Sequence, residues 1–257
     1  MGILNITPDS FYKKSRITTA KTALKRADEM IRGGVDILDI GGESTRPGSD
    51  PISEEEELKR ILPVVKAVIK EFDLPVSVDT YKSKVAKAIL EEGASIINDI
   101  SALRFDPDMA ETIASTGAGV VIMHITGKPK TMQKNPSYKN LMREITSYLA
   151  ESIKQAVSSG IPEDRIIIDP GIGFGKSFSH NITILKKLKQ FKILKKPILL
   201  GLSRKSFIGK ILDLPPEDRL EGTLAASVIG IINGAQILRT HDVKETQRAI
   251  AVAEAVL

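Results

Sequence analysis

The segment Val35–Gly48, with the sequence VDILDIGGESTRPG, begins the unit from which the fold can be inferred. Its first part, Val35–Ile40, is a nearly continuous apolar run, as expected for a parallel strand covered on both faces. A polar, glycine-rich loop follows. Ser53-Glu54-Glu55-Glu56 then has the pattern of a capping box, which predicts a helix over Glu54–Phe72. A buried strand followed by a loop and an amphipathic helix is typical of a β/α unit.

The same unit recurs along all 257 residues. The predicted strands are Ile3–Ile6, Val35–Ile40, Val76–Asp79, Ser95–Asp99, Gly119–His124, Arg165–Asp169, Pro197–Leu202 and Ala235–Arg239. The predicted helices are Ala20–Arg32, Glu54–Phe72, Lys82–Glu91, Pro107–Ser115, Leu141–Ser158, Ile182–Phe191, Arg219–Ile232 and Val243–Leu257. Eight strands alternating with eight helices in about 250 residues predict an α/β fold, a single (β/α)8 TIM barrel forming one domain over residues 1–257. A doubly wound open sheet is the alternative.

The composition excludes several classes of site. The chain has no cysteine, so it cannot form disulfides, thiolate metal sites or a cysteine nucleophile. It therefore suits a reducing compartment, and we expect a cytoplasmic protein. Three scattered histidines are too few for a strong zinc signature. No apolar run is long enough to span a membrane, so we expect no membrane partner.

The formal net charge of +5 is compatible with either a nucleic-acid partner or an anionic small substrate. The densest basic run, Lys186–Lys196, has apolar residues at helical spacing, which favours the solvated face of a surface helix over a nucleic-acid patch. Aromatic residues make up only 4% of the chain, so platforms for stacking bases are scarce. We therefore expect small-molecule substrates and no nucleic acid.

Polar residues follow every predicted strand, at the positions where TIM barrels carry their chemistry. One such residue alone could cap a helix or open a turn, but eight polar strand ends together predict a convergent active site. The longest loop, Ile125–Tyr138, follows the fifth strand and is a candidate lid. The run Gly175-Lys176-Ser177 resembles the end of a phosphate-binding P-loop, but that motif requires glycine at position 170, which is proline.

Taken together, the strand-end motifs resemble those of the dihydropteroate synthases of folate biosynthesis, a family of pterin-binding enzymes. The segments that carry the resemblance are Asn5–Phe11, Gly41–Gly48, Val78–Thr80, Asn98–Ile100, Asp169–Lys176, Ser203–Phe207 and Arg239–Asp242. The resemblance covers essentially the whole chain. It implies a transferase that joins 6-hydroxymethyl-7,8-dihydropterin pyrophosphate to p-aminobenzoate and releases pyrophosphate. It also implies a TIM barrel, a homodimer formed through late helices, and a target of sulfonamides.

The same resemblance implies a role for individual residues. Asp79, Asn98, Asp169 and Lys205 would hold the pterin, and Asn5 would help bind Mg²⁺ with the pyrophosphate. Thr45, Arg46, Arg239 and His241 would hold the anionic leaving group, with Arg239 also packed on the pterin ring. Pro47, Phe174 and Ser203 would border the p-aminobenzoate pocket. Within this set, the catalytic residues would be Asp79, Lys205 and Arg239.

The chemistry of these residue types agrees with those roles. A pterin edge offers N–H donors beside ring-nitrogen acceptors, which carboxylates, amides and ammonium groups can satisfy. Pyrophosphate requires concentrated positive charge, which two arginines, a histidine and Mg²⁺ would supply. Loss of pyrophosphate leaves positive charge on the pterin methylene. Stabilising both separating charges is electrostatic catalysis, so no protein nucleophile is required.

Two other functions share parts of this pattern. A pterin-dependent methyltransferase, which passes a methyl group from a folate to a corrinoid protein, would share the pterin carboxylates but not the anion pocket. A non-catalytic paralogue would bind pterin only. The first loop also departs from the family, because Lys13 and Lys14 stand where small and acidic residues are usual. They either point to solvent or attract an anionic substrate.

Overall fold

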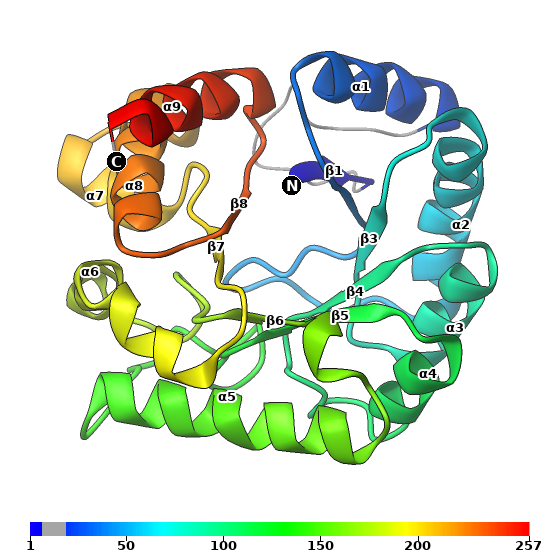
Figure 1. Ribbon diagram of the computed structural model, residues 1–257, viewed down its shortest axis with the longest axis horizontal. Coiled ribbons are helices and arrows are strands. Elements are labelled where there is room, and N and C mark those ends of the chain that lie inside the picture. The colour runs from blue at the N-terminus through cyan, green and yellow to red at the C-terminus, as the bar shows by residue number, and fades with distance from the viewer. Residues whose placement is uncertain (7–18, 257) are drawn as a thin grey trace.

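The computed structural model describes residues 1–6 and 19–256 (Figure 1), so Lys13 and Lys14 lie outside the described residues. The strands are β1 Gly2–Asn5, β2 Leu38–Gly41, β3 Val76–Asp79, β4 Ile96–Asp99, β5 Gly119–Met123, β6 Ile166–Asp169, β7 Leu199–Gly201 and β8 Ile237–Arg239. The helices are α1 Ala20–Arg32, α2 Glu54–Glu71, α3 Ser83–Glu91, α4 Met109–Thr116, α5 Leu141–Ser158, α6 Phe178–Lys186, α7 Ser206–Leu212, α8 Leu220–Ile232 and α9 Val243–Val256. Figure 1 shows the strands at the centre and the helices around them.

The strands close into a barrel. Strands β1 to β6 pair in parallel in chain order, and β7 pairs in parallel with β8. Two single bridges join these sheets: Ile3 donates its N–H to the Thr240 carbonyl at 2.9 Å, and Ile168 donates to the Pro197 carbonyl at 2.9 Å. The TIM-barrel prediction is therefore confirmed. The open-sheet alternative is wrong because the first strand is bridged to the end of β8, and β6 is bridged to the start of β7, so the sheet closes on itself.

The barrel interior has an apolar floor. Met1, Val121 and Leu199 form a buried cluster there, with Ile37, Ile96, Ile167 and Ile237 packed against it. Side chains two residues apart along a strand point to the same side of a sheet. The next inward positions are therefore Asp39 above Ile37, Asn98 above Ile96, Asp169 above Ile167 and Arg239 above Ile237. The strand periodicity thus places a polar layer directly on an apolar one.

The main hydrophobic core lies between the strands and the surrounding helices, and it includes Leu4, Ile40, Ile97 and Ile168, each fully or almost fully buried. These side chains point outward from the barrel, on the opposite face from the polar layer. Burial on both faces explains why the strands are almost continuously apolar in sequence.

Three local predictions need correction. Ser53 accepts a hydrogen bond from Glu56 N, but the Glu56 carboxylate bonds Arg60 instead of closing the capping box. The helix predicted over Ile182–Phe191 begins earlier, at Phe178, and breaks into a 3-10 helix over Leu188–Leu194, where Leu188 and Phe191 are buried. Helix α7 was not predicted, because seven residues with Gly209 among them show no clear helical period.

In the described part of the chain, no helix is long and apolar enough to cross a membrane.

Candidate active site

The strand register brings the predicted polar residues to one level. Asn5 pairs with Gly41, Gly41 with Asp79, and Asp79 with Asn98, across four neighbouring strands. Farther round the barrel, Asp169 pairs with Met123, and Arg239 pairs with Gly201. Parallel strands share one carboxyl edge, so these side chains converge at one mouth of the barrel.

Arg239 is the centre of this level. Its Nε donates to Asp39 Oδ2 at 2.6 Å, and its Nη2 donates to Asp79 Oδ2 at 2.9 Å. The arginine side chain is 19% exposed, and the two carboxylates are 0% and 8% exposed. Because guanidinium donors lie in a fixed plane, two carboxylates on different strands fix its orientation. Its N–H groups not used in these two bonds can serve a ligand.

Asp39 was not predicted as a site residue, although its carboxylate accepts hydrogen bonds from three side chains inside the barrel. Besides Arg239, it accepts from Ser77 Oγ at 2.6 Å and from Asn98 Nδ2 at 3.3 Å. It lies inside an apolar strand rather than at the strand end, so a search of strand ends overlooks it. The signal that could have found it is an acidic residue within a run otherwise suited to burial, because buried carboxylates are almost always paired.

Asp79 retains an unused acceptor. Among the described residues, its Oδ1 atom is buried and has no hydrogen-bond partner. Burial raises the pKa of Asp79 to about 7, opposed by Arg239 and reinforced by Asp39. A buried acceptor without a partner is costly, so this atom is available to accept an N–H from a bound ring.

Lys205 and Phe174 lie together beside Asp169. The Lys205 ammonium is 4.9 Å from the centroid of the Phe174 ring, and it donates to the Ile172 carbonyl. Burial lowers the pKa of Lys205 to about 8, while the Asp169 charge acts in the opposite direction. Asp169 Oδ1 accepts from Gly171 N at 2.7 Å, which fixes the carboxylate at the start of the glycine-rich loop.

Ser203 and His241 form a second pair, joined by a 2.9 Å hydrogen bond between Ser203 Oγ and His241 Nδ1. Burial lowers the pKa of His241 to about 3, with further lowering from the cations Arg239, Arg204 and Arg46. Burial and these cations favour the neutral imidazole, whereas an anion bound beside His241 would favour the protonated form that the sequence suggested.

The loop after β2 carries Thr45 and Arg46, both half-buried, and Pro47, which is exposed. A buried ion-pair cluster holds the base of this loop. Lys82 Nζ donates to Glu43 and to Glu57 Oε2, the latter at 2.6 Å. Tyr81 Oη also donates to Glu43, at 2.6 Å. None of these four residues was predicted from the sequence.

Comparison with known proteins agrees with this geometry. The sequence profile of the family described as "Pterin binding enzyme" matches residues 1–241. The chain belongs to the dihydropteroate synthase family of pterin-binding enzymes. It is 46% identical to the dihydropteroate synthase of Escherichia coli K12 over 257 residues, which cover 100% of this chain and 91% of that protein.

Solved structures of the family superpose closely. A Yersinia pestis dihydropteroate synthase in a sulfonamide drug complex has a TM-score of 0.96 and 44% identity, covering 99% of this chain and 92% of the other. A Xanthomonas albilineans dihydropteroate synthase with 4-aminobenzoic acid has a TM-score of 0.92 and 41% identity, covering 99% and 91%. Similarity at this level extends to the strand ends that carry the polar layer.

The described residues of the site form no cluster of metal ligands. Within residues 1–6 and 19–256, no three His, Asp or Glu side chains are grouped so as to hold a metal ion. Asn5 fits a smaller role. Gly41 has no side chain, and a Cβ there would lie 3.6 Å from Asn5 Oδ1 and 3.4 Å from Asp79 Cβ. The Asn5 amide oxygen and the Asp79 side chain therefore lie on either side of Gly41 at the strand ends, and this oxygen could complete the shell of a Mg²⁺ held mainly by phosphate oxygens and water.

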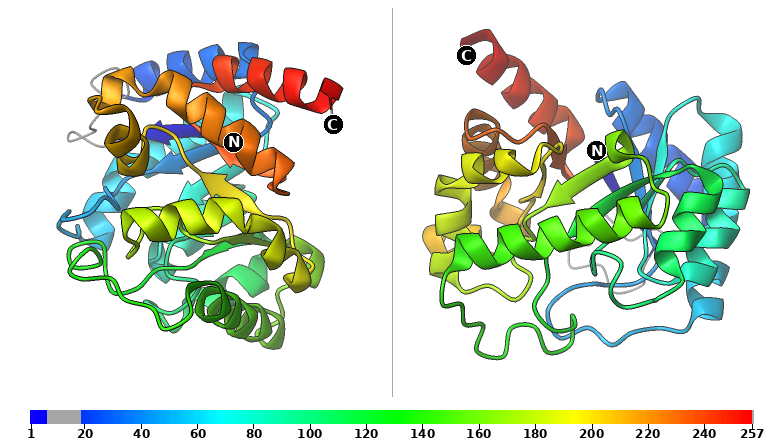
Figure 2. Two further views of the ribbon diagram at one scale, coloured as in Figure 1. Left: turned by 90° about the vertical axis from the view of Figure 1, so that its left-hand side faces the viewer. Right: turned by 60° about the horizontal axis from the view of Figure 1, so that its bottom comes forward.

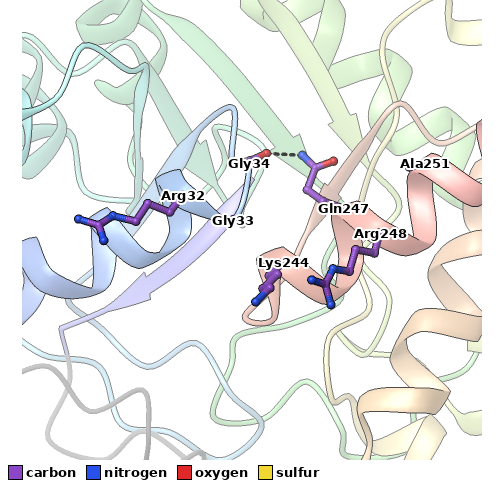
Figure 3. Close-up of a pocket in the computed structure, with 7 residues that line it drawn as sticks. All are labelled: Arg32, Gly33, Gly34, Lys244, Gln247, Arg248 and Ala251. Atoms are coloured by element: carbon purple, nitrogen blue, oxygen red, sulfur yellow. Dashed lines mark hydrogen bonds between the residues drawn. The ribbon is translucent and has the colours of Figure 1, made fainter.

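A separate cavity of about 490 Å³ lies between the end of α1 and helix α9 (Figure 3). Arg32, Lys244 and Arg248 line it, and Gln247 donates to the Gly34 carbonyl across it. It contains none of the predicted site residues. The candidate active site is thus defined by the convergent polar layer rather than by this surface cavity.

Proposed function

We propose that the protein is a dihydropteroate synthase. It joins 6-hydroxymethyl-7,8-dihydropterin pyrophosphate to p-aminobenzoate and releases pyrophosphate. The observation that carries this proposal is the Asp39–Arg239–Asp79 cluster with its unpartnered buried acceptor, at the barrel mouth of a chain from this family. The relatives' names favour this activity over the corrinoid-dependent methyltransferase and over a pterin-binding protein without turnover.

In the proposed complex the pterin edge faces Asp79, Asn98, Asp169 and Lys205. Asp79 Oδ1 is the acceptor that such an edge would satisfy, and Asp169 presents a second fixed carboxylate. Lys205 supplies a donor for the ring acceptors, next to Phe174. Each hydrogen bond to a charged group stabilises the complex by roughly 1.5–3 kcal/mol, so two or three fix the ring orientation.

The pyrophosphate faces Thr45, Arg46, Arg239 and His241. Arg46 and Arg239 contribute positive charge, and His241, whose Nδ1 is hydrogen-bonded to Ser203, can donate to a phosphate oxygen from Nε2 when that nitrogen carries the proton. Mg²⁺, when bound with Asn5, would neutralise part of the phosphate charge. As the bond from the pterin methylene to the phosphate oxygen breaks, the arylamine nitrogen attacks that carbon and then loses a proton. The protein orients the reactants and stabilises the separating charges.

The p-aminobenzoate pocket in this proposal is bordered by Pro47, Phe174 and Ser203. These residues stand on the loops after β2, β6 and β7, so the pocket walls belong to three separate segments. Complexes of relatives with 4-aminobenzoic acid and with a sulfonamide drug support the assignment of these ligands to this family. We also propose that sulfonamides compete for this pocket.

A coupled assay of pyrophosphate release tests the function directly. The expected result is release that requires both the pterin pyrophosphate and p-aminobenzoate. Mg²⁺ titration in the same assay tests the metal proposal, and Asn5→Ala should raise the Mg²⁺ concentration needed for half-maximal rate. Release independent of p-aminobenzoate would contradict the synthase assignment. Protection from thermal unfolding by pyrophosphate would further distinguish this site from that of a methyltransferase.

We further propose a homodimer formed through the last helices. Seven of the ten large apolar side chains that are exposed in the described residues lie in or just after α7, in α8 or in α9: Ile211, Leu212, Leu214, Ile229, Ile232, Val252 and Val256. Helices α8 and α9 pack side by side (Figure 2). An apolar surface of this kind marks an interaction site. Light scattering should give twice the 28.0 kDa chain mass, and a monomer at micromolar concentration would contradict the proposal.

The cytoplasmic location stays a prediction, which cell fractionation would test.

A further inference from the structure

The glycine-rich loop after β6 is held by its carbonyl groups. Four consecutive carbonyl oxygens, those of residues 172 to 175, each accept a hydrogen bond from a different side chain. The donors are Lys205 to Ile172, Gln133 to Gly173 at 2.6 Å, Lys176 to Phe174 at 2.9 Å, and Tyr138 to Gly175 at 2.7 Å. Two of these donors, Gln133 and Tyr138, come from the loop after β5. We call this loop, residues 125–138, the β5 strap.

The backbone of the glycine-rich loop has a shape that depends on its glycines. Gly171, Gly173 and Gly175 have φ values of 71°, 86° and 63°, a region that residues with a Cβ rarely adopt. A Cβ on Gly175 would lie 2.8 Å from the Thr126 carbonyl oxygen, so the loop packs directly on the start of the β5 strap. Three glycines within five residues give a flexible backbone, so the hydrogen bonds from the β5 strap to Gly173 and Gly175 add to those within the loop in fixing the position of Phe174.

The β5 strap also contacts the loop after β2. Gly48 donates its N–H to the Pro129 carbonyl at 3.0 Å, and Lys130 forms an ion pair with Asp50. Between its two ends the strap is anchored by Met132, which is 3% exposed and lies in the apolar cluster against which Phe174 packs. One segment thus connects the loop that carries Pro47 with the loop that carries Phe174.

We propose that Gln133 and Tyr138 are positioning residues, which set the distance between two walls of the p-aminobenzoate pocket through the β5 strap. The inference rests on the proposed function, because it takes Pro47 and Phe174 as pocket walls. Of the pterin groups, Asp79 and Asn98 stand on β3 and β4, outside the strap contacts, whereas Asp169 and Lys205 contact the glycine-rich loop near its start. Loss of the strap bonds should therefore weaken the use of p-aminobenzoate more than the use of pterin pyrophosphate.

The test uses Gln133→Met, Tyr138→Phe and the double variant, in the full chain. Each single change removes one hydrogen-bond donor while keeping side-chain size. From the net free energy that one such hydrogen bond contributes, we expect each lost bond to raise KM for p-aminobenzoate roughly 3- to 10-fold. The KM for pterin pyrophosphate should stay within about twofold of the parental value. Calorimetric titration with p-aminobenzoate in the presence of pyrophosphate should show the same loss without turnover.

Two variants serve as matched controls. Lys134→Ala removes an exposed neighbour of Gln133 whose side chain makes no hydrogen bond or ion pair among the described residues. Gln155→Met removes an amide on α5 that donates to the Leu103 carbonyl at 3.2 Å, outside the strap. Both should keep the parental KM values. Equal KM for p-aminobenzoate in the strap variants and the parent, or an equal rise in both KM values, would overturn the inference. A parent that fails to release pyrophosphate would instead overturn the proposed function.

Discussion

Asp39→Asn is the substitution that best tests how the polar layer works. Asp39 is fully buried and accepts from Arg239, Asn98 and Ser77. Asparagine has the same shape. Its oxygen can still face Arg239 and Asn98, and its amide can face Ser77, whose hydroxyl can turn to accept. The fold should therefore persist, but the contact with Arg239 loses its ionic character.

The expected cost follows from these contacts. Arg239 keeps Asp79 as an ionic partner, so the loss is one charge-assisted hydrogen bond rather than a whole buried pair, about 2 kcal/mol of stability. For a chain of this size that lowers Tm by about 4–8 °C. A guanidinium held more weakly on the Asp39 side should also misplace the charge facing the pyrophosphate, and kcat should fall by roughly 10- to 100-fold.

Thermal unfolding and the pyrophosphate-release assay measure the two effects. Ser77→Ala is the matched control, because it removes one Asp39 contact and leaves the ion pair with Arg239 in place. It should lower Tm by less than Asp39→Asn and keep kcat within a few-fold of the parent. Parental Tm and parental kcat in Asp39→Asn would refute the reasoning that Asp39 orients Arg239.

Four further predictions concern the substrate contacts. Asp169→Asn should lower pterin affinity at least roughly tenfold, because one or two charge-assisted bonds at about 1.5–3 kcal/mol each are weakened; unchanged affinity in calorimetry would exclude the contact. Lys205→Ala should lower turnover by orders of magnitude with little change in Tm, whereas near-normal turnover would show that the lysine serves only the loop. Burial raises the pKa of Asp79 to about 7, so kcat/KM for the pterin substrate should fall as pH drops through 7. The contribution of this carboxyl to the free energy of unfolding should fall as pH rises from about 4 to 7, because the folded state binds the proton more tightly than the unfolded state. Asp79→Asn should abolish both trends, and their persistence would assign them to another group. Finally, p-aminobenzoate should bind detectably only with pyrophosphate or pterin pyrophosphate present, since ordering separate pocket walls opposes binding; equal affinity without them would refute ordered assembly.

Much of the fold could be predicted because the strands alternate with helices and are buried on both faces. Every predicted strand overlaps an observed one, and α1 and α5 have the predicted bounds. The predicted site residues Asp79, Asn98, Asp169 and Arg239 are recognisable because each ends an apolar run. The roles given to individual residues remain predictions, since geometry shows which side chains meet and not what they bind.

What the sequence missed has a common physical cause. Asp39 lies within a strand, and Glu43, Lys82 and Glu57 become one buried cluster only through contacts between α2 and the loops after β2 and β3. Such pairs are 25 and 39 residues apart in sequence. No periodicity encodes them. The end of α6 was missed for a different reason. The backbone of Lys187, with φ −106° and ψ 16°, departs from the α-helical conformation. The apolar residues keep their helical spacing across this position, so the sequence pattern does not indicate the break.

The arrangement of charge in the site suits a reaction that separates charge. With both carboxylates ionised, the Asp39–Arg239–Asp79 cluster carries one net negative charge inside the barrel mouth. Arg46, one of the cations near His241, belongs to the loop after β2, whereas the side chain of Arg204 is buried and paired with Asp242. In the proposed reaction positive charge develops on the pterin methylene while the departing pyrophosphate is negative. Carboxylates fixed beside the pterin and cations fixed beside the pyrophosphate oppose neither charge and need no reorganisation as the charges separate. The two carboxylates that hold Arg239 also offset its charge, so that its remaining N–H groups can face the pyrophosphate without placing a full positive charge beside the pterin carbon that becomes positive.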